Sequence, residues 1–122
     1  MSIIDSIWNG LDRFLGIDMR NGSDGVTAEM EYFANNPHNH PDNHFTFKFK
    51  NTGREWRIYI EKMPSLGRRA SDAHSTHRYT DSLNGKRYIC RQPQPSSLAD
   101  AQAVARVWAD NILEYIVKGT TF

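Results

Sequence analysis

The chain has 122 residues, which is enough for one domain with a single hydrophobic core and too few for two. Six Phe, five Tyr and three Trp exclude a disordered chain, because such chains lack large apolar side chains. A single cysteine excludes an internal disulfide and a cysteine-based zinc finger. No apolar run reaches the roughly 18 residues that span a bilayer, and Asp5 and Asp12 interrupt the apolar start, so we expect no signal peptide. The composition predicts a small soluble cytoplasmic domain.

The net charge of +1 hides a gradient along the chain. Residues 1–44 hold seven acids and two bases, whereas residues 45–95 hold eleven bases and four acids. The basic middle has two interpretations: it attracts an anionic ligand, or it neutralises the chain's own acidic segment. The mixed charge does not favour duplex DNA as a partner.

Apolar residues between Ser2 and Gly16 recur at helical spacing and predict an amphipathic helix. Ser2 suits the start of that helix and Gly16 its end. Its polar face is mainly acidic, whereas helices that lie on membranes usually carry Lys and Arg there. We therefore expect this helix to pack on the protein's own sheet or on a second copy, and we expect no membrane partner.

Three strands follow, in which apolar and polar residues alternate. They cover residues 26–32, 45–50 and 56–61, with a hairpin turn at residues 51–54 between the last two. The polar faces place Glu29 and Glu31 near Lys48 and Lys50, as charge pairs between strands.

Residues 63–76 form a long irregular stretch, and loops of this length are often functional or disordered. A second hairpin pairs residues 77–81 with residues 87–91, and Asn84-Gly85 between them predicts a two-residue type I′ turn.

The last element is a helix over residues 98–118, which Ser97 caps and Gly119 ends. The predicted order is therefore α-β-β-β-β-β-α. This order indicates an α+β fold in one domain: an antiparallel sheet of about five strands with both terminal helices packed on one face.

Three histidines, His38, His40 and His44, lie within seven residues of one another and are the candidate metal ligands. The alternative is an ordinary polar turn, since His, Asn, Pro and Asp are common in turns. No HExxH or cysteine-containing zinc pattern accompanies them. We favour the turn and expect neither a metal nor a cofactor.

The basic stretch and second hairpin form the candidate ligand site. Arginine offers paired donors to phosphate oxygens, histidine adds a hydrogen bond, and tyrosine stacks on a base. The candidate residues are Arg68, Arg69, His74, His77, Arg78, Tyr79, Arg87 and Tyr88. The alternative is that these basic side chains face water or protect a sheet edge.

Motifs of an enzyme are missing from the sequence. It contains no glycine-rich phosphate loop, no GxSxG elbow and no paired carboxylates in a motif. Cys90 with His74 or His77 is a possible nucleophile–base pair. A lone cysteine in a strand is more typical of a small core residue, so we expect no catalytic activity.

The C-terminal half carries the segments His77-Arg78-Tyr79 and Arg87-Tyr88-Ile89-Cys90, followed by a helix with Ala101, Ala105 and Trp108. This pattern resembles small uncharacterised proteins of phages and integrative elements of Gram-positive bacteria. The resemblance implies an accessory gene of a mobile element, where non-enzymatic inhibitors of host defence are common. Such inhibitors cap a nuclease, as anti-CRISPR proteins do, or sequester a cyclic nucleotide-like signal, as anti-Thoeris and anti-CBASS sponges do.

These observations lead to three hypotheses. The first is a non-enzymatic protein that sequesters a nucleotide-like anion through the basic stretch and hairpin. The second is a protein–protein inhibitor of a host defence protein, acting through the acidic N-terminal region or the sheet face. The third is a metal-dependent enzyme built on the histidines. The two apolar helices also predict a homo-oligomer, because one sheet face is small for both.

Overall fold

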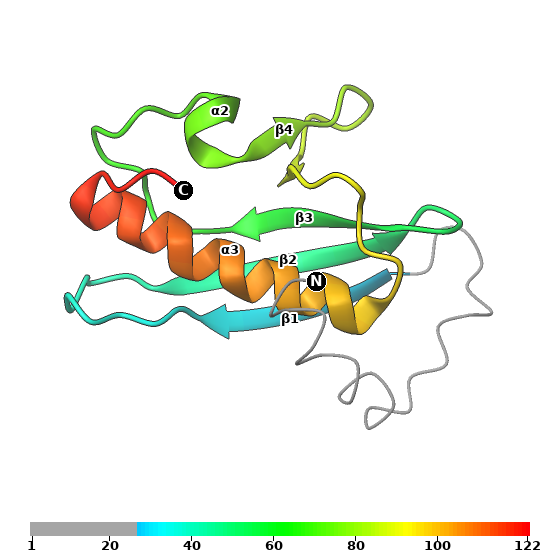
Figure 1. Ribbon diagram of the computed structural model, residues 1–122, viewed down its shortest axis with the longest axis horizontal. Helices are drawn as coiled ribbons and strands as arrows, with labels where there is room; N and C mark the ends of the chain where they lie inside the picture. The colour runs from blue at the N-terminus through cyan, green and yellow to red at the C-terminus, as the bar shows by residue number, and fades with distance from the viewer. Residues whose placement is uncertain (1–26) are drawn as a thin grey trace.

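The computed structural model describes residues 27–122, and the helix predicted over residues 2–16 lies outside this range. The described chain is an antiparallel five-stranded sheet with a long C-terminal helix across one face (Figure 1). The elements are β1 (Thr27–Phe33), β2 (His44–Asn51), β3 (Trp56–Lys62), α2 (Ala73–Thr76), β4 (Arg78–Thr80), β5 (Arg87–Ile89) and α3 (Leu98–Lys118). The predicted sheet and C-terminal helix are confirmed.

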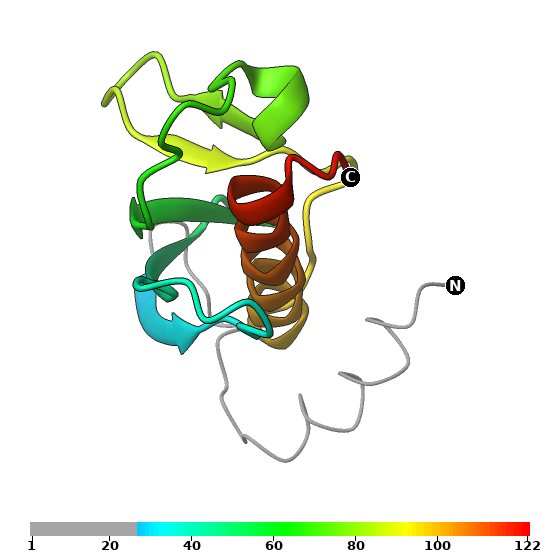
Figure 2. The same cartoon turned by 90° about the vertical axis from the view of Figure 1, so that its left-hand side faces the viewer.

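The strands lie in the order β1-β2-β3-β5-β4, so β1 and β4 form the two edges of the sheet. β1, β2 and β3 are seven or eight residues long and pair along most of their length. β4 and β5 have three residues each, and the β4–β5 hairpin joins β3 through the single register pair Tyr59 and Tyr88. Figure 2 shows this hairpin set apart from the first three strands.

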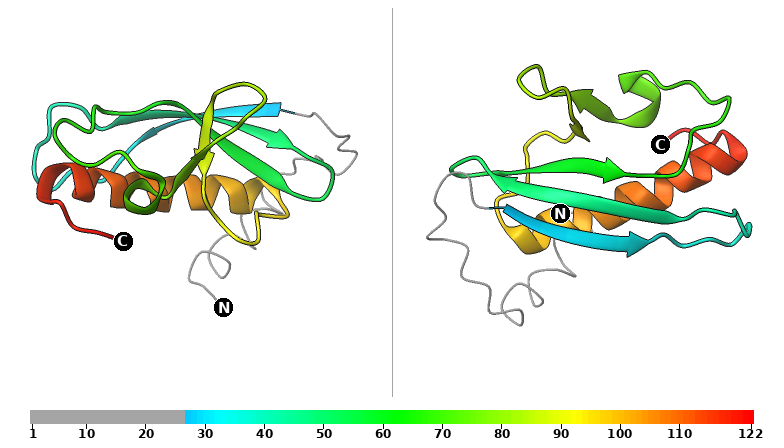
Figure 3. Two further views of the ribbon diagram at one scale, coloured as in Figure 1. Left: turned by 90° about the horizontal axis from the view of Figure 1, so that it is seen from above. Right: turned by 180° about the vertical axis from the view of Figure 1, so that it is seen from behind.

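The core lies between the first three strands and α3. Alternation along β2 directs Phe45, Phe47 and Phe49 to the α3 side, where each is fully or almost fully buried. Trp108 of α3 meets Phe45 and Phe47 edge-on, with ring centroids 6.0 and 6.1 Å apart. The left view of Figure 3 shows α3 lying along this face of the sheet.

Helix α3 has the predicted ends. The Ser97 hydroxyl accepts a hydrogen bond from the Asp100 amide at 3.1 Å, and Gly119 ends the helix in the left-handed conformation, with φ 75°. A Cβ at Gly119 would lie 2.8 Å from Arg69 Nη1, the end of a long side chain that can move aside, so it is the left-handed backbone conformation that requires glycine there.

The connection between β4 and β5 differs from the prediction. Six residues separate the strands, one more than the predicted strand bounds leave, and each strand is shorter than predicted. A type I′ turn needs positive φ at both central residues. Gly85 has a φ of 72°, but Asn84 is not among the residues with positive φ. The Asp81 carbonyl accepts from the Gly85 amide at 2.8 Å, and this bond closes a wider loop. The type I′ prediction is therefore wrong.

The stretch between β3 and β4 contains the short helix α2, which the sequence did not indicate. The Asp72 carboxylate caps α2 by accepting from the Ser75 amide at 3.2 Å. Hydrogen bonds from the Ser75 side chain and from its amide lower the pKa of Asp72. The Thr76 carbonyl accepts from the Trp108 indole at 3.0 Å, which fastens α2 to α3. Within residues 27–122, no helix combines the length and apolar character needed to cross a bilayer.

Candidate functional site

Strand alternation separates the arginines of the hairpin from its tyrosines. Arg78 lies opposite Ile89 and is buried on the α3 side of the hairpin, whereas Tyr79 lies opposite Tyr88 on the other side, which we call the open face. Arg87 pairs with Thr80 and belongs to the α3 side. The structure therefore places Arg78 and Arg87 on one face and both tyrosines on the other, so they do not form one site.

Three tyrosines form a row on the open face across β3, β5 and β4. The ring centroid of Tyr88 is 6.1 Å from that of Tyr59 and 5.8 Å from that of Tyr79. The Arg57 guanidinium stacks over the Tyr88 ring at 4.2 Å. Burial and a hydrogen bond to Asp81 raise the pKa of Tyr59. The row holds the hairpin to the sheet, because Tyr59 and Tyr88 provide the only strand pairing between β3 and β5 within the described residues.

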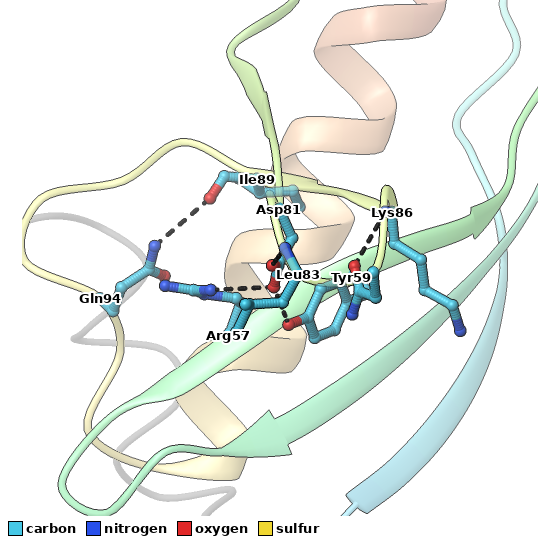
Figure 4. A network of polar contacts seen from close by, with 8 residues as sticks. Arg57, Tyr59, Asp81, Leu83, Lys86, Ile89 and Gln94 are labelled. Atoms are coloured by element: carbon cyan, nitrogen blue, oxygen red, sulfur yellow. Dashed lines mark hydrogen bonds and ion pairs between the residues drawn. The ribbon is translucent and has the colours of Figure 1, made fainter.

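Asp81 is the centre of the polar contacts that hold this hairpin (Figure 4). Its carboxylate accepts from the Tyr59 hydroxyl at 2.7 Å, from Arg57 Nη1 at 3.2 Å and from the Leu83 amide at 2.8 Å. The bond from Tyr59 and the bond from the Leu83 amide hold the pKa of Asp81 below its usual range. The sequence did not predict that Arg57, Tyr59 and Asp81 form a unit; the only local signal was an aspartate between a strand and its turn.

Arg78 is the most unusual charged group on the α3 side. Its side chain is 7% exposed, and its hydrogen bonds go to neutral acceptors: the Thr76 hydroxyl at 3.1 Å and the Met63 sulfur at 3.4 Å. Its Nη2 is buried without a partner. Burial and the charge of the nearby Arg87 lower the pKa of Arg78. Arg78 is therefore a buried cation without a counter-ion in residues 27–122.

Two further arginines flank Ile89, the residue opposite Arg78. Arg87 is exposed at the start of β5, and Arg91 lies two residues beyond Ile89, half-buried, with a buried Nε that lacks a hydrogen-bond partner. In the described part of the chain, neither forms an ion pair with a carboxylate. We call Arg78, Arg87 and Arg91 the arginine cluster. Guanidinium groups without acids can offer donors to an anion, and Arg87 is near enough to Arg78 for its charge to lower the pKa of Arg78.

The other basic candidates lie at the far end of α3. Arg69 donates to the carbonyls of Ile116 and Val117 at 3.2 and 3.1 Å, so it satisfies the last turn of α3. Arg68 is exposed beside it. Both line an open hollow of about 570 Å³ together with His40, Asp42 and Ile116. This hollow contains an acid and the negative end of a helix, which makes it a poor anion site.

The two histidines near α2 make different contacts. His77 ends α2 with a φ of 52°, its ring lies 4.5 Å from the Phe122 ring, and its Nε2 contacts the Phe122 carbonyl. His74 is exposed. Cys90 is half-buried beyond β5, and its interaction with Tyr79 raises the pKa of that tyrosine. The His77 ring is directed to Phe122 and His74 is exposed, and within residues 27–122 no hydrogen bond joins either ring to Cys90.

The three candidate metal ligands lie apart. His38 Nε2 contacts Glu114 of α3 at 3.0 Å, His44 Nε2 contacts Glu31 of β1 at 3.0 Å, and His40 hydrogen-bonds within its own loop. Across the part of the chain that the structure describes, no group of three or more His, Cys, Asp or Glu is placed to hold a metal ion. The structure thus uses His38 and His44 to connect the loop and β2 to neighbouring elements.

Comparisons with protein-family models, with curated proteins and with solved structures found no match to this chain.

Proposed function

We propose that this chain is a non-enzymatic binding protein that holds a small phosphorylated anion at the arginine cluster. The observation that carries this proposal is Arg78, a guanidinium with 7% exposure and no carboxylate partner in residues 27–122. The other arginines of the cluster lie on the same side of the hairpin or just beyond it.

Burying a cation without a counter-ion costs free energy, on the order of several kcal/mol. Such a group usually recovers this cost from a charged partner or marks a functional site. A phosphate at the cluster would supply the missing negative charge and accept from donors that now lack partners, namely Arg78 Nη2 and Arg91 Nε. Exposed Arg87 gives the anion its first contact from solvent.

The separation of the arginines from the tyrosines determines which part of a nucleotide would contact the protein. Tyr79 and Tyr88 lie on the open face, so they do not stack on the base of a ligand whose phosphate contacts Arg78. The cluster would recognise the phosphate groups, and a nucleoside part would extend from them toward solvent. A role in sequestering a nucleotide-like defence signal of a phage host is the biological setting we propose for this binding; it is supported by the resemblance of the C-terminal half and by the cluster.

Titration calorimetry with inorganic pyrophosphate and a panel of cyclic and linear nucleotides tests the proposal. We expect Arg87→Gln to weaken binding roughly tenfold, the loss of about one charge-assisted contact. Lys50→Gln is the matched control, because it removes an exposed positive charge from β2, outside the cluster. No binding of any phosphorylated compound, or equal losses in both variants, would contradict the proposal.

A further inference from the structure

The outer edge of β1 carries backbone groups that no described residue pairs. β1 lies at the end of the sheet next to β2 (Figure 1) and keeps strict register with it from Thr27 to Phe33. The Ala34 amide, just beyond β1, donates to the Asn43 carbonyl at 2.9 Å and so points toward the β2 side. In an antiparallel pair this direction alternates. The N–H and C=O groups of Glu29, Glu31 and Phe33 therefore point outward.

Natural edge strands are usually protected by proline, by charged side chains, most often lysine, by bulges or by short length. The only charged side chains of β1 are Glu29 and Glu31, which repel an acidic or identical strand and leave a basic one free to pair. β1 has seven residues and contains no proline, glycine or lysine, and its pairing with β2 shows no bulge. The other edge strand, β4, has three residues. Within residues 27–122, β1 is thus the one long edge suited to accept another strand.

The side chains of β1 define what such a strand must carry. On the open face, Glu29 and Glu31 are exposed; on the α3 side, Ala28, Met30 and Tyr32 are half-buried. The neighbour on the paired side shows a compatible pattern, because β2 places Lys48 opposite Glu29 and Phe47 opposite Met30. Alternating basic and apolar residues satisfy both faces of β1 at once.

A second copy of β1 fits this edge poorly. Antiparallel pairing of two β1 strands over their whole length is centred on Met30 and places Glu29 opposite the second copy's Glu31. Two such pairs form around the two-fold axis, and like charges directly opposite one another destabilise a sheet. The acidic pattern thus disfavours self-pairing and favours a basic strand.

We propose that β1 is a docking edge for an extended segment of a partner protein in which Lys or Arg alternates with apolar residues. The segment adds an antiparallel strand to the sheet, with its backbone bonded to the outward groups of Glu29 and Glu31 and its basic side chains beside their carboxylates. The arginine cluster is in the β4–β5 hairpin and beyond, at the opposite edge of the sheet, so this site is independent of the anion site.

The test uses the full chain and a fluorescent peptide of the length of β1 in which lysine alternates with valine. We expect saturable binding by fluorescence anisotropy, and roughly tenfold weaker binding of the same peptide with glutamate in place of lysine. Hydrogen exchange gives the second readout: the amides of Glu29 and Glu31 gain protection with the lysine peptide, whereas the amide of Met30 is unchanged. Uniform protection, or none, would overturn the proposal.

Two variants separate backbone pairing from charge. Glu29→Pro removes one outward N–H without removing a bond to β2, and proline is tolerated at such edge positions; we expect it to abolish peptide binding. Glu29→Gln keeps that N–H and should weaken binding only a few-fold. Circular dichroism checks the fold of both. Undiminished binding to Glu29→Pro would overturn the proposal, as would a dimer of the free chain that this variant dissociates, since that result assigns the edge to a second copy.

Discussion

Two parts of the sheet are held together by different forces. β1, β2 and β3 pack a row of phenylalanines against α3, with Phe45, Phe47 and Phe49 at 0, 1 and 0% exposure. The β4–β5 hairpin is instead fastened through polar contacts to one carboxylate, that of Asp81, and through stacked rings. The first part tolerates few changes, because its packing is dense. The second can carry unpaired charge such as Arg78, and it is where we place function.

We expect the largest loss of stability from a substitution among the buried phenylalanines of β2. Phe47→Ala removes a ring that meets Phe45, Phe49 and Trp108, and should lower the free energy of unfolding by about 3–5 kcal/mol. Phe33→Ala is the control, since Phe33 is 64% exposed on β1, and should change that free energy by less than about 1 kcal/mol. Urea unfolding measures the free energy of unfolding of both variants. Similar losses in the two variants would contradict the distinction between the core and the edge of the sheet.

The second-largest expected loss of stability comes from weakening the attachment of the β4–β5 hairpin to β3. Asp81→Ala removes the acceptor of Tyr59, Arg57 and the Leu83 amide, so it should lower the melting temperature by roughly 5–10 °C. Hydrogen exchange locates the loss: the amide of Tyr88 should lose protection while that of Phe47 keeps it. Equal loss at both sites would mean that hairpin and core unfold together.

The same carboxylate gives the hairpin a dependence on pH. Because folding lowers the pKa of Asp81, its contribution to stability is present above the unfolded pKa of about 4 and is lost as the pH falls through the lower folded value. Asp81→Asn should therefore lack this part of the acid destabilisation. Melting curves across the acid range of both proteins provide the comparison, and parallel curves would contradict it.

At Arg78 we expect a substitution to raise the free energy of unfolding, by a smaller amount than the losses above. Arg78→Met keeps an unbranched side chain, shorter than that of arginine, and removes a buried cation without a counter-ion, so it should raise the free energy of unfolding by about 1–2 kcal/mol. The same change should abolish binding of the phosphorylated anion. A variant that is both less stable and still binds would show that Arg78 is a structural residue.

The smallest expected effect on stability concerns Tyr32 in the edge strand β1, and it appears at alkaline pH. Tyr32 donates to the Asp110 carboxylate at 3.0 Å, and burial together with this bond raises the pKa of Tyr32 to about 12. Its contribution to stability is fully present below pH 10 and is lost as the pH rises through about 12. Ultraviolet titration should show a phenolate that forms near pH 12 and is missing from Tyr32→Phe. An unchanged titration would assign this phenolate to another tyrosine.

The parts that sequence patterns predicted are those in which local signals decide the structure. The stripe of apolar residues between Ser97 and Gly119 predicted α3 with its observed ends, because a hydroxyl cap and a left-handed glycine act on their own helix. The alternation in residues 45–50 predicted the buried phenylalanines of β2 in the same way. Of the charge pairs predicted between Glu29, Glu31 and Lys48, Lys50, the register places only Glu29 opposite a lysine, Lys48. Glu31 lies opposite Thr46 and contacts His44 instead, and Lys50 lies opposite Thr27.

The hairpin was predicted less well, for two physical reasons. The prediction placed Arg78 and Tyr79 at one ligand, but neighbouring residues of a strand point to opposite faces of the sheet. The loop at Asn84 depends on Asp81, whose partners Arg57 and Tyr59 lie more than twenty residues earlier in the chain. No local pattern encodes a contact between residues so far apart in sequence.

Binding of a phosphorylated anion by the arginine cluster can be followed by NMR of the arginine side-chain Nε–Hε groups during titration with inorganic pyrophosphate. We expect saturable shifts for Arg78 and Arg87, and no shift for Arg57, which is already bound to Asp81. Shifts confined to the exposed Arg68, or equal weak shifts at every arginine, would contradict it.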